Sequence, residues 1–97
     1  MYNQMKIEFD PIKRDQTLLH RGLDFADCQR AFEGVTYTFE DIRKGYGETR
    51  FITWALMRSR LVVIVWTPRG AVRRIISLRK ANERETDIFN QALERSG

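Results

Sequence analysis

Residues 72–81 read Val-Arg-Arg-Ile-Ile-Ser-Leu-Arg-Lys-Ala, and this stretch decides how the rest of the chain can be arranged. Its alternation and β-branched content are typical of a strand, yet it carries four cations, which are Arg73, Arg74, Arg79 and Lys80. Asn82 follows, with Glu85 three residues later, which is close to a capping box at a helix N-terminus. The pattern predicts a basic strand that leads directly into a C-terminal helix and keeps one face in water.

Size and composition place the chain among small globular proteins. Ninety-seven residues suffice for one core, so we expect residues 1–97 to form a single domain. No stretch approaches the roughly 18 apolar residues of a membrane span, and the first residues lack the apolar centre of a signal peptide. The lone cysteine, Cys28, cannot form an internal disulfide. We therefore expect a cytoplasmic protein without membrane contact.

The net charge of +4 is distributed unevenly along the chain. Residues 1–41 hold 5 Lys and Arg against 8 Asp and Glu, whereas residues 42–81 hold 10 against Glu48 alone. Residues 82–97 are acidic again, with 2 basic residues against 4 acidic ones. Such segregation favours a surface that binds a polyanion, nucleic acid above all, although solvated strands and turns would also account for it.

The periodicity changes once along the chain, from helical to alternating. Asp10-Pro11 predicts the start of a helix that ends before Gly22. Asp24 predicts a second helix, whose buried face would hold Phe25, Cys28 and Phe32. Four strands then follow, at about residues 35–39, 50–57, 60–67 and 71–78, before a helix over about residues 82–95. The predicted fold class is α+β, with two N-terminal helices, a four-stranded antiparallel sheet and a C-terminal helix.

Side-chain alternation sorts the last strand into two faces. The more apolar set, which we assign to the core, is Val72, Arg74, Ile76 and Leu78. The other set, Arg73, Ile75, Ser77 and Arg79, then puts two arginines and a hydroxyl on the open face, where arginine forks suit phosphates. Arg74 has no place in this scheme unless it reaches an edge or pairs with an acid such as Glu48.

Other residues could share this surface. Arg50, Trp54 and Trp66 are candidates, since an aromatic ring beside arginines can stack on an unpaired base, although tryptophans flanked by aliphatic residues usually lie in the core. Glu48 is either a general base or an ion-pair partner. The only histidine, His20, suits acid–base chemistry near neutral pH, but a predicted helix C-terminus also favours it for its charge alone. No ligand cluster, phosphate loop or nucleophile motif is present, so no metal or cofactor is predicted.

These residues also resemble a known family, the BrnT toxins of type II toxin–antitoxin systems. The resemblance covers about residues 7–89 and rests on residues 9–11 with Lys13, residues 22–27, residues 47–48 with 50–51 and, above all, residues 73–85. It implies a RelE-like fold and metal-independent RNA cleavage that stops translation and growth. One departure is that many relatives carry Lys-His before the glycine, whereas this chain has His20-Arg21-Gly22.

The resemblance also implies partners and site residues. The partner would be a BrnA-like antitoxin with a ribbon-helix-helix DNA-binding domain, and operator DNA would be bound only through this antitoxin. The catalytic candidates that the resemblance implies are Glu48, Arg50, Arg73, Arg79 and Lys80. The candidates for RNA binding come from the residues themselves and are Arg73, Ser77, Arg79, Trp66 and Arg69. Two alternatives remain, a nucleic-acid-binding module without catalysis and a protein-interaction domain whose basic face binds an acidic partner.

Overall fold

The computed structural model describes residues 5–43, 45 and 47–96. In order along this part of the chain, the elements are β1 (Lys6–Glu8), α1 (Pro11–Arg21), the 3-10 turn η2 (Phe25–Asp27), α2 (Cys28–Ala31), β2 (Thr36–Glu40), β3 (Phe51–Met57), β4 (Arg60–Arg69), β5 (Val72–Lys80) and α3 (Glu83–Ser96). None of these helices is both long enough and apolar enough to cross a membrane.

The sheet corrects the predicted fold class. Its five described strands lie in the order β1-β5-β4-β3-β2, and the β1–β5 pair is parallel while the other three pairs are antiparallel. The protein is thus α+β with three α-helices and a mixed five-stranded sheet, and the prediction of a four-stranded antiparallel sheet after two helices is wrong. The strand left out of the predicted sheet is β1, whose three residues were too few for a periodic signal.

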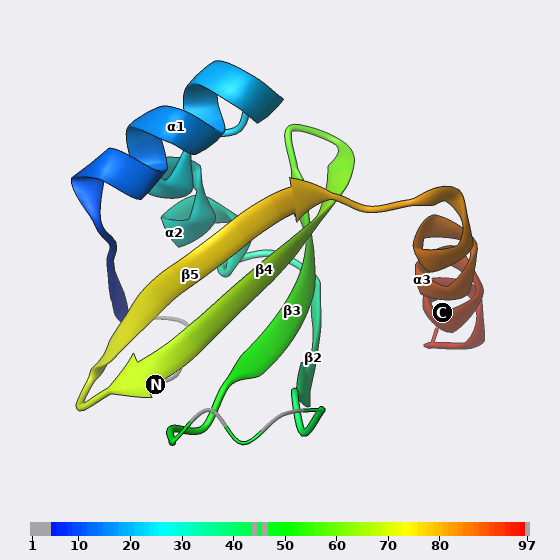
Figure 1. Cartoon of the computed structure of the whole chain (residues 1–97). Helices are drawn as coiled ribbons and strands as arrows, with labels where there is room; N and C mark the ends of the chain where they lie inside the picture. The colour runs from blue at the N-terminus through cyan, green and yellow to red at the C-terminus, as the bar shows by residue number, and fades with distance from the viewer. Residues whose placement is uncertain (1–4, 44, 46, 97) are drawn as a thin grey trace.

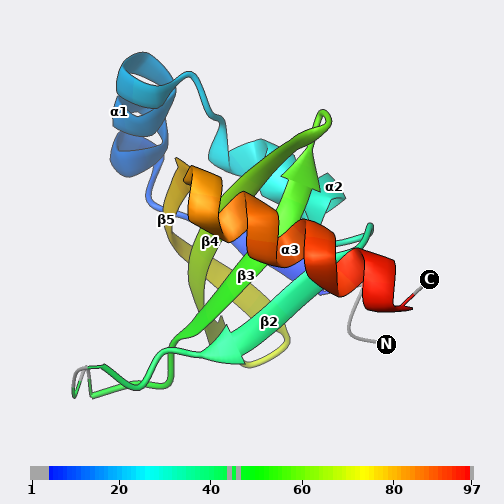
Figure 2. The ribbon, with the colours of Figure 1, turned by 90° about the vertical axis from the view of Figure 1, so that its right-hand side faces the viewer.

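Helices lie on both faces of this sheet (Figures 1 and 2). The helices α1 and α2 lie on one face, and α3 crosses the other face in front of the strands in Figure 2. The core lies on the α2 side, where Phe25, Cys28 and Phe32 pack with Ile64 and the inward residues of β3 and β5. The predicted buried face of the second helix is therefore confirmed, although that helix is only one turn long after η2.

Helix boundaries follow the local signals in the sequence. The Asp10 side chain accepts a hydrogen bond from the Ile12 amide at 2.9 Å, and Gly22 ends α1 at φ 69°. At α3, the Asn82 side chain accepts from the Glu85 amide, while Glu85 Oε1 accepts from the Asn82 amide, both at 2.8 Å. The capping box predicted for the C-terminal helix is confirmed.

A β-bulge in β5 changes the predicted faces of that strand. Val65 pairs with Ser77 and Trp66 pairs with Ile75, so Ile76 is an extra residue without a partner on β4. Alternation therefore switches at Ile76. Before the bulge, the inward residues are Arg73 and Ile75, and after it Leu78 points inward, so the predicted faces are correct only for the second half of the strand.

The two hairpins that join β3, β4 and β5 have tight turns. The gap between the predicted strands 50–57 and 60–67 is confirmed as a turn at Arg58-Ser59, and both residues have positive φ, 52° and 70°. The second turn lies at Gly70-Ala71, later than the gap between the predicted strands 60–67 and 71–78 begins, because β4 continues through Pro68. Pairing with β3 stops at Trp66, so the missing amide hydrogen of Pro68 is tolerated in the strand.

Candidate functional site

Two of the predicted RNA-binding residues lie in the core. Arg73 is 7% exposed, and its guanidinium carbon lies 4.2 Å from the centre of the Phe32 ring and 5.1 Å from that of Trp66. Trp66 is also buried and donates from Nε1 to the Thr53 hydroxyl at 2.8 Å. The prediction that Arg73 shares the open face with Ser77 and Arg79 is wrong, and so is the prediction of a surface position for Trp66.

Burial of the Arg73 guanidinium carries a desolvation cost. Its Nε and Nη1 atoms have no hydrogen-bond partner, and burial lowers the pKa of the group. Contact with two aromatic rings offsets part of this desolvation. Arg73 thus holds Phe32 against the sheet, which is a structural contact on the side away from the open face.

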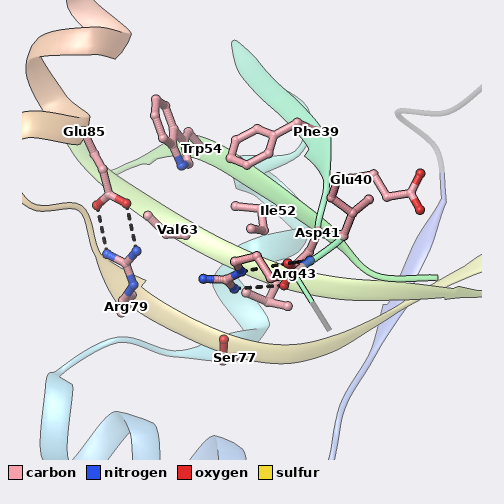
Figure 3. Close-up of a pocket in the computed structure, with 12 residues that line it drawn as sticks. Phe39, Glu40, Asp41, Arg43, Ile52, Trp54, Val63, Ser77, Arg79 and Glu85 are labelled. Carbon is pink, nitrogen blue, oxygen red and sulfur yellow. Dashed lines mark hydrogen bonds and ion pairs between the residues drawn. The ribbon is translucent and has the colours of Figure 1, made fainter. Parts of the chain in front are cut away.

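Ser77 and Arg79 line a hollow on the opposite face, the sheet hollow (Figure 3). Its volume is about 430 Å³, and the lining residues are Phe39, Glu40, Asp41, Ile42, Arg43, Ile52, Trp54, Val63, Val65, Ser77, Arg79 and Glu85. The floor is apolar and aromatic, and the charged groups stand at its rim. An unpaired base could stack on the aromatic floor while its phosphates meet the rim cations.

The arginines of the sheet hollow already have carboxylate partners. Arg79 donates to both carboxylate oxygens of Glu85, at 2.9 and 2.8 Å, which raises the pKa of Arg79 and lowers that of Glu85. Arg43 likewise donates to both oxygens of the buried Asp41, at 2.8 and 2.9 Å (Figure 3). With Glu40, three carboxylates and two arginines line the sheet hollow. A phosphate that binds Arg79 must therefore compete with Glu85.

Two other predicted catalytic residues, Glu48 and Arg50, form a separate cluster with Arg69. Glu48 accepts from Arg50 Nε at 3.3 Å and from Arg69 Nη2 at 3.4 Å, so one carboxylate lies between two guanidinium groups. The place of Arg74 is also settled, because it pairs with Glu8 of β1 at 2.6 Å rather than with Glu48.

At the edge of β5, residues of α1 and of β5 that are distant in sequence line one groove. Because β1 pairs only with Val72, Arg73 and Arg74, the rest of β5 is an edge that α1 flanks. Between them lies the α1 groove, about 340 Å³, lined by Lys13, Gln16, Thr17, His20, Arg21, Phe25, Ile76 and Ser77. Ser77 thus lines hollows on both sides of the strand. Lys13 and Arg21 were named only in the comparison with the BrnT pattern, and no sequence pattern joins them to Ser77.

Lys80 lies in a third space, the hairpin hollow, of about 290 Å³. Its lining residues are Arg21, Gly22, Leu23, Asp27, Met57, Arg58, Arg60 and Lys80. The predicted site residues therefore fall in four places, which are the core, the sheet hollow, the Glu48 cluster and the hairpin hollow. In the part of the chain that the structure describes, no three His, Cys, Asp or Glu side chains are grouped to hold a metal ion.

Comparison with known proteins identifies the class. A family model described as "Ribonuclease toxin, BrnT, of type II toxin-antitoxin system" matches residues 9–85. A search of the curated proteins finds no match. Since the family model matches most of the chain, the protein belongs to the BrnT family of ribonuclease toxins. This family implies an RNA substrate and an antitoxin partner.

Proposed function

We propose that this toxin is a metal-independent endoribonuclease whose RNA substrate lies across the exposed edge of β5. The observation that carries this proposal is the position of Ser77, which lines the sheet hollow with Arg79 and the α1 groove with Lys13 and His20. Bulges are frequent beside active sites, where they redirect side chains. Cations, an imidazole and aromatic rings thus surround one short strand segment.

The chemistry requires a cation beside the phosphorus, a base near the 2′-oxygen and a proton donor near the 5′-oxygen. The 2′-oxygen of RNA attacks the adjacent phosphorus while the bond to the 5′-oxygen breaks, which gives a 2′,3′-cyclic phosphate and a 5′-hydroxyl. Arg79, once released from Glu85, stabilises the negative charge of the phosphorane, as preorganised cations do. His20 accepts the proton of the 2′-hydroxyl, and a water molecule from solvent gives a proton to the leaving 5′-oxygen. Trp54 and Phe39 offer faces for base stacking.

The Glu48 cluster is the second candidate for the base. A carboxylate held between Arg50 and Arg69 also combines a proton acceptor with cations that could bind a phosphate. Arg73 and Lys80 complete the set of candidates, but Arg73 is buried on the opposite face and Lys80 lies in the hairpin hollow. RNA cleavage by variants at His20 and at Glu48 shows which of the two residues is the base.

We further propose a BrnA-like ribbon-helix-helix antitoxin as the partner, in the cytoplasm, with operator DNA bound only through it. The exposed aromatic side chains beside the sheet hollow, Tyr37 and Phe39, suit such a protein contact. An acidic antitoxin segment would also compete with RNA for Arg79.

The test is cleavage of RNA by the purified toxin in excess EDTA. Wild-type toxin and an Arg84→Gln control, which alters an exposed cation on α3, should cleave equally. Arg79→Gln should lower the rate at least 100-fold while thermal unfolding stays cooperative, and His20→Gln should do the same if His20 is the base. A large loss in Glu48→Gln with full activity in His20→Gln would move the base to the Glu48 cluster. Intact RNA at high enzyme excess would overturn the proposal.

A further inference from the structure

Of the sheet hollow, the α1 groove and the hairpin hollow, the hairpin hollow has the largest excess of cations over carboxylates. Four cations, Arg21, Arg58, Arg60 and Lys80, line it together with a single carboxylate, Asp27. They come from the end of α1, the β3–β4 turn and the end of β5, which lie at the same end of the molecule in Figures 1 and 2. By contrast, acids outnumber cations around the sheet hollow. A polyanion therefore meets a more favourable potential here than at the sheet hollow.

The one carboxylate neutralises little of this charge. Asp27 lies 3.6 Å from Arg58 Nη2, a long ion pair, and the Arg58 side chain is 84% exposed. Such a pair contributes little and is readily screened or exchanged. Arg21 is held more firmly, because its Nη1 donates to the Leu78 carbonyl at 2.8 Å. One end of the hollow is thus fixed to β5, while Arg58 and Arg60 remain available to a ligand.

The backbone of the β3–β4 turn is strained, which lowers the stability of the hairpin. Arg58 and Ser59 both have positive φ in a two-residue turn, where Asn-Gly is the preferred pair. Left-handed backbone costs a residue with a side chain about 1 kcal/mol. A strained turn that places two arginines around a cationic hollow is the kind of outlier that points to a binding role.

The hollows also adjoin one another through shared residues. Ser77 belongs to both the sheet hollow and the α1 groove, and Arg21 belongs to both the α1 groove and the hairpin hollow. An RNA strand that crosses the β5 edge at Ser77 can therefore continue along α1 past Arg21. Its phosphates would next meet Arg58, Arg60 and Lys80.

We propose that the hairpin hollow is a second RNA-binding subsite, which holds backbone phosphates of the substrate away from the cleaved bond. The inference rests on the proposed ribonuclease function and extends it. Arg58 and Arg60 are binding residues without a part in the chemistry. RNA is favoured over an acidic protein segment because the hollow continues into the groove where RNA is proposed to be cut.

The test measures binding of 2′-O-methyl RNA, which the proposed mechanism cannot cleave, over a series of salt concentrations and oligonucleotide lengths. The variants are Arg60→Gln, the double variant Arg58→Gln with Arg60→Gln, and Arg84→Gln as the matched control on α3. The double variant should bind long oligonucleotides about tenfold more weakly. Its slope of log affinity against log salt should fall by about 1.4, since each phosphate contact on a single strand contributes about 0.7. Short oligonucleotides and the control should show no change.

The outcomes separate this inference from the proposed function. If the wild type cleaves RNA but the double variant keeps the wild-type affinity, salt slope and length preference, only the second subsite is overturned. The same holds if the double variant loses affinity for the antitoxin and not for RNA. If the wild type neither cleaves nor binds RNA, both proposals fail. The single Arg60→Gln variant guards against misfolding, because it leaves the ion pair of Arg58 with Asp27 intact. Its affinity should fall by about half as much on a logarithmic scale.

Discussion

At the scale of single residues, Arg73 shows how one position can satisfy a sequence pattern and still lie on the wrong face. Its neighbours in sequence are those of a basic strand, but its guanidinium lies against the rings of Phe32 and Trp66 in the core. Two of its nitrogens lack partners there. The residue therefore contributes to stability through aromatic contact while it carries a desolvation penalty.

This balance predicts the effect of Arg73→Met. Methionine has similar length and contacts aromatic rings well, and it removes the unpartnered nitrogens, so the free energy of unfolding should change by less than about 1.5 kcal/mol. Arg73→Ala should cost about 2–4 kcal/mol because it leaves a cavity. Urea unfolding measures both. If Arg73 is structural, RNA cleavage by Arg73→Met should stay within about threefold of the wild type, whereas a loss of 100-fold would restore Arg73 to the catalytic set.

Glu85 gives a second prediction at this scale. Glutamine at position 85 retains an acceptor for the Asn82 amide, so the capping box survives, but the competing negative charge beside Arg79 is gone. Glu85→Gln should therefore bind 2′-O-methyl RNA several-fold more tightly than the wild type at low salt. Glu83→Gln, on the same helix turn, is the matched control. Weaker binding by Glu85→Gln would mean that the ion pair positions Arg79 rather than masking it.

At the scale of elements, the β3–β4 turn carries a prediction about stability. Replacement of Arg58-Ser59 by Asn-Gly suits positive φ at both positions, so this variant should be more stable by about 1–2 kcal/mol. Thermal unfolding measures the gain. The same variant lacks Arg58 and should bind RNA more weakly, so stability and binding would change in opposite directions. A fall in melting temperature would show that the native turn is not strained.

Elements also show what the sequence could and could not predict. Caps and turns at Asp10, Gly22 and Asn82 depend on neighbours within four residues, so local patterns were sufficient. The face of Arg73 depends on one extra residue, Ile76, whose insertion is visible only in the pairing with β4. Ser77 and Arg79 follow the bulge, and the prediction that they share a face away from the core is confirmed. The meeting of Ser77 with His20 depends on how α1 packs, which no local pattern encodes.

At the scale of the whole molecule, two ion pairs predict the response to acid. Hydrogen bonds from Arg14 hold the pKa of Asp24 below its ordinary 3.8, and those from Arg79 hold the pKa of Glu85 below its ordinary 4.5. Because both values are lower in the folded protein, the stabilisation is present above the unfolded values and is lost as pH falls through the folded ones. The free energy of unfolding should stay level from pH 7 to about 5 and decline below about 4.

The matched variant for this prediction is Asp24→Asn, measured by urea unfolding from pH 7 to 3. It lacks the ionised partner of Arg14, so it should be less stable than the wild type at pH 7 and should lose less stability on acidification. Parallel curves for the two proteins would show that Asp24 has the same pKa in the folded and unfolded states.

The parallel pairing of β1 with β5 has a consequence for folding. Lys6 pairs with Val72, so β1 cannot join the sheet before β5 has been made. The ion pair of Glu8 with Arg74 likewise joins residues 66 positions apart. During synthesis, the antiparallel hairpins of β2, β3 and β4 can form in sequence, but the sheet is completed only after β5 has left the ribosome. High contact order at this edge delays the assembly of the surface around Ser77 until β5 has been made. The proposed RNA-binding surface at Ser77 therefore cannot exist before β5 has paired with β4.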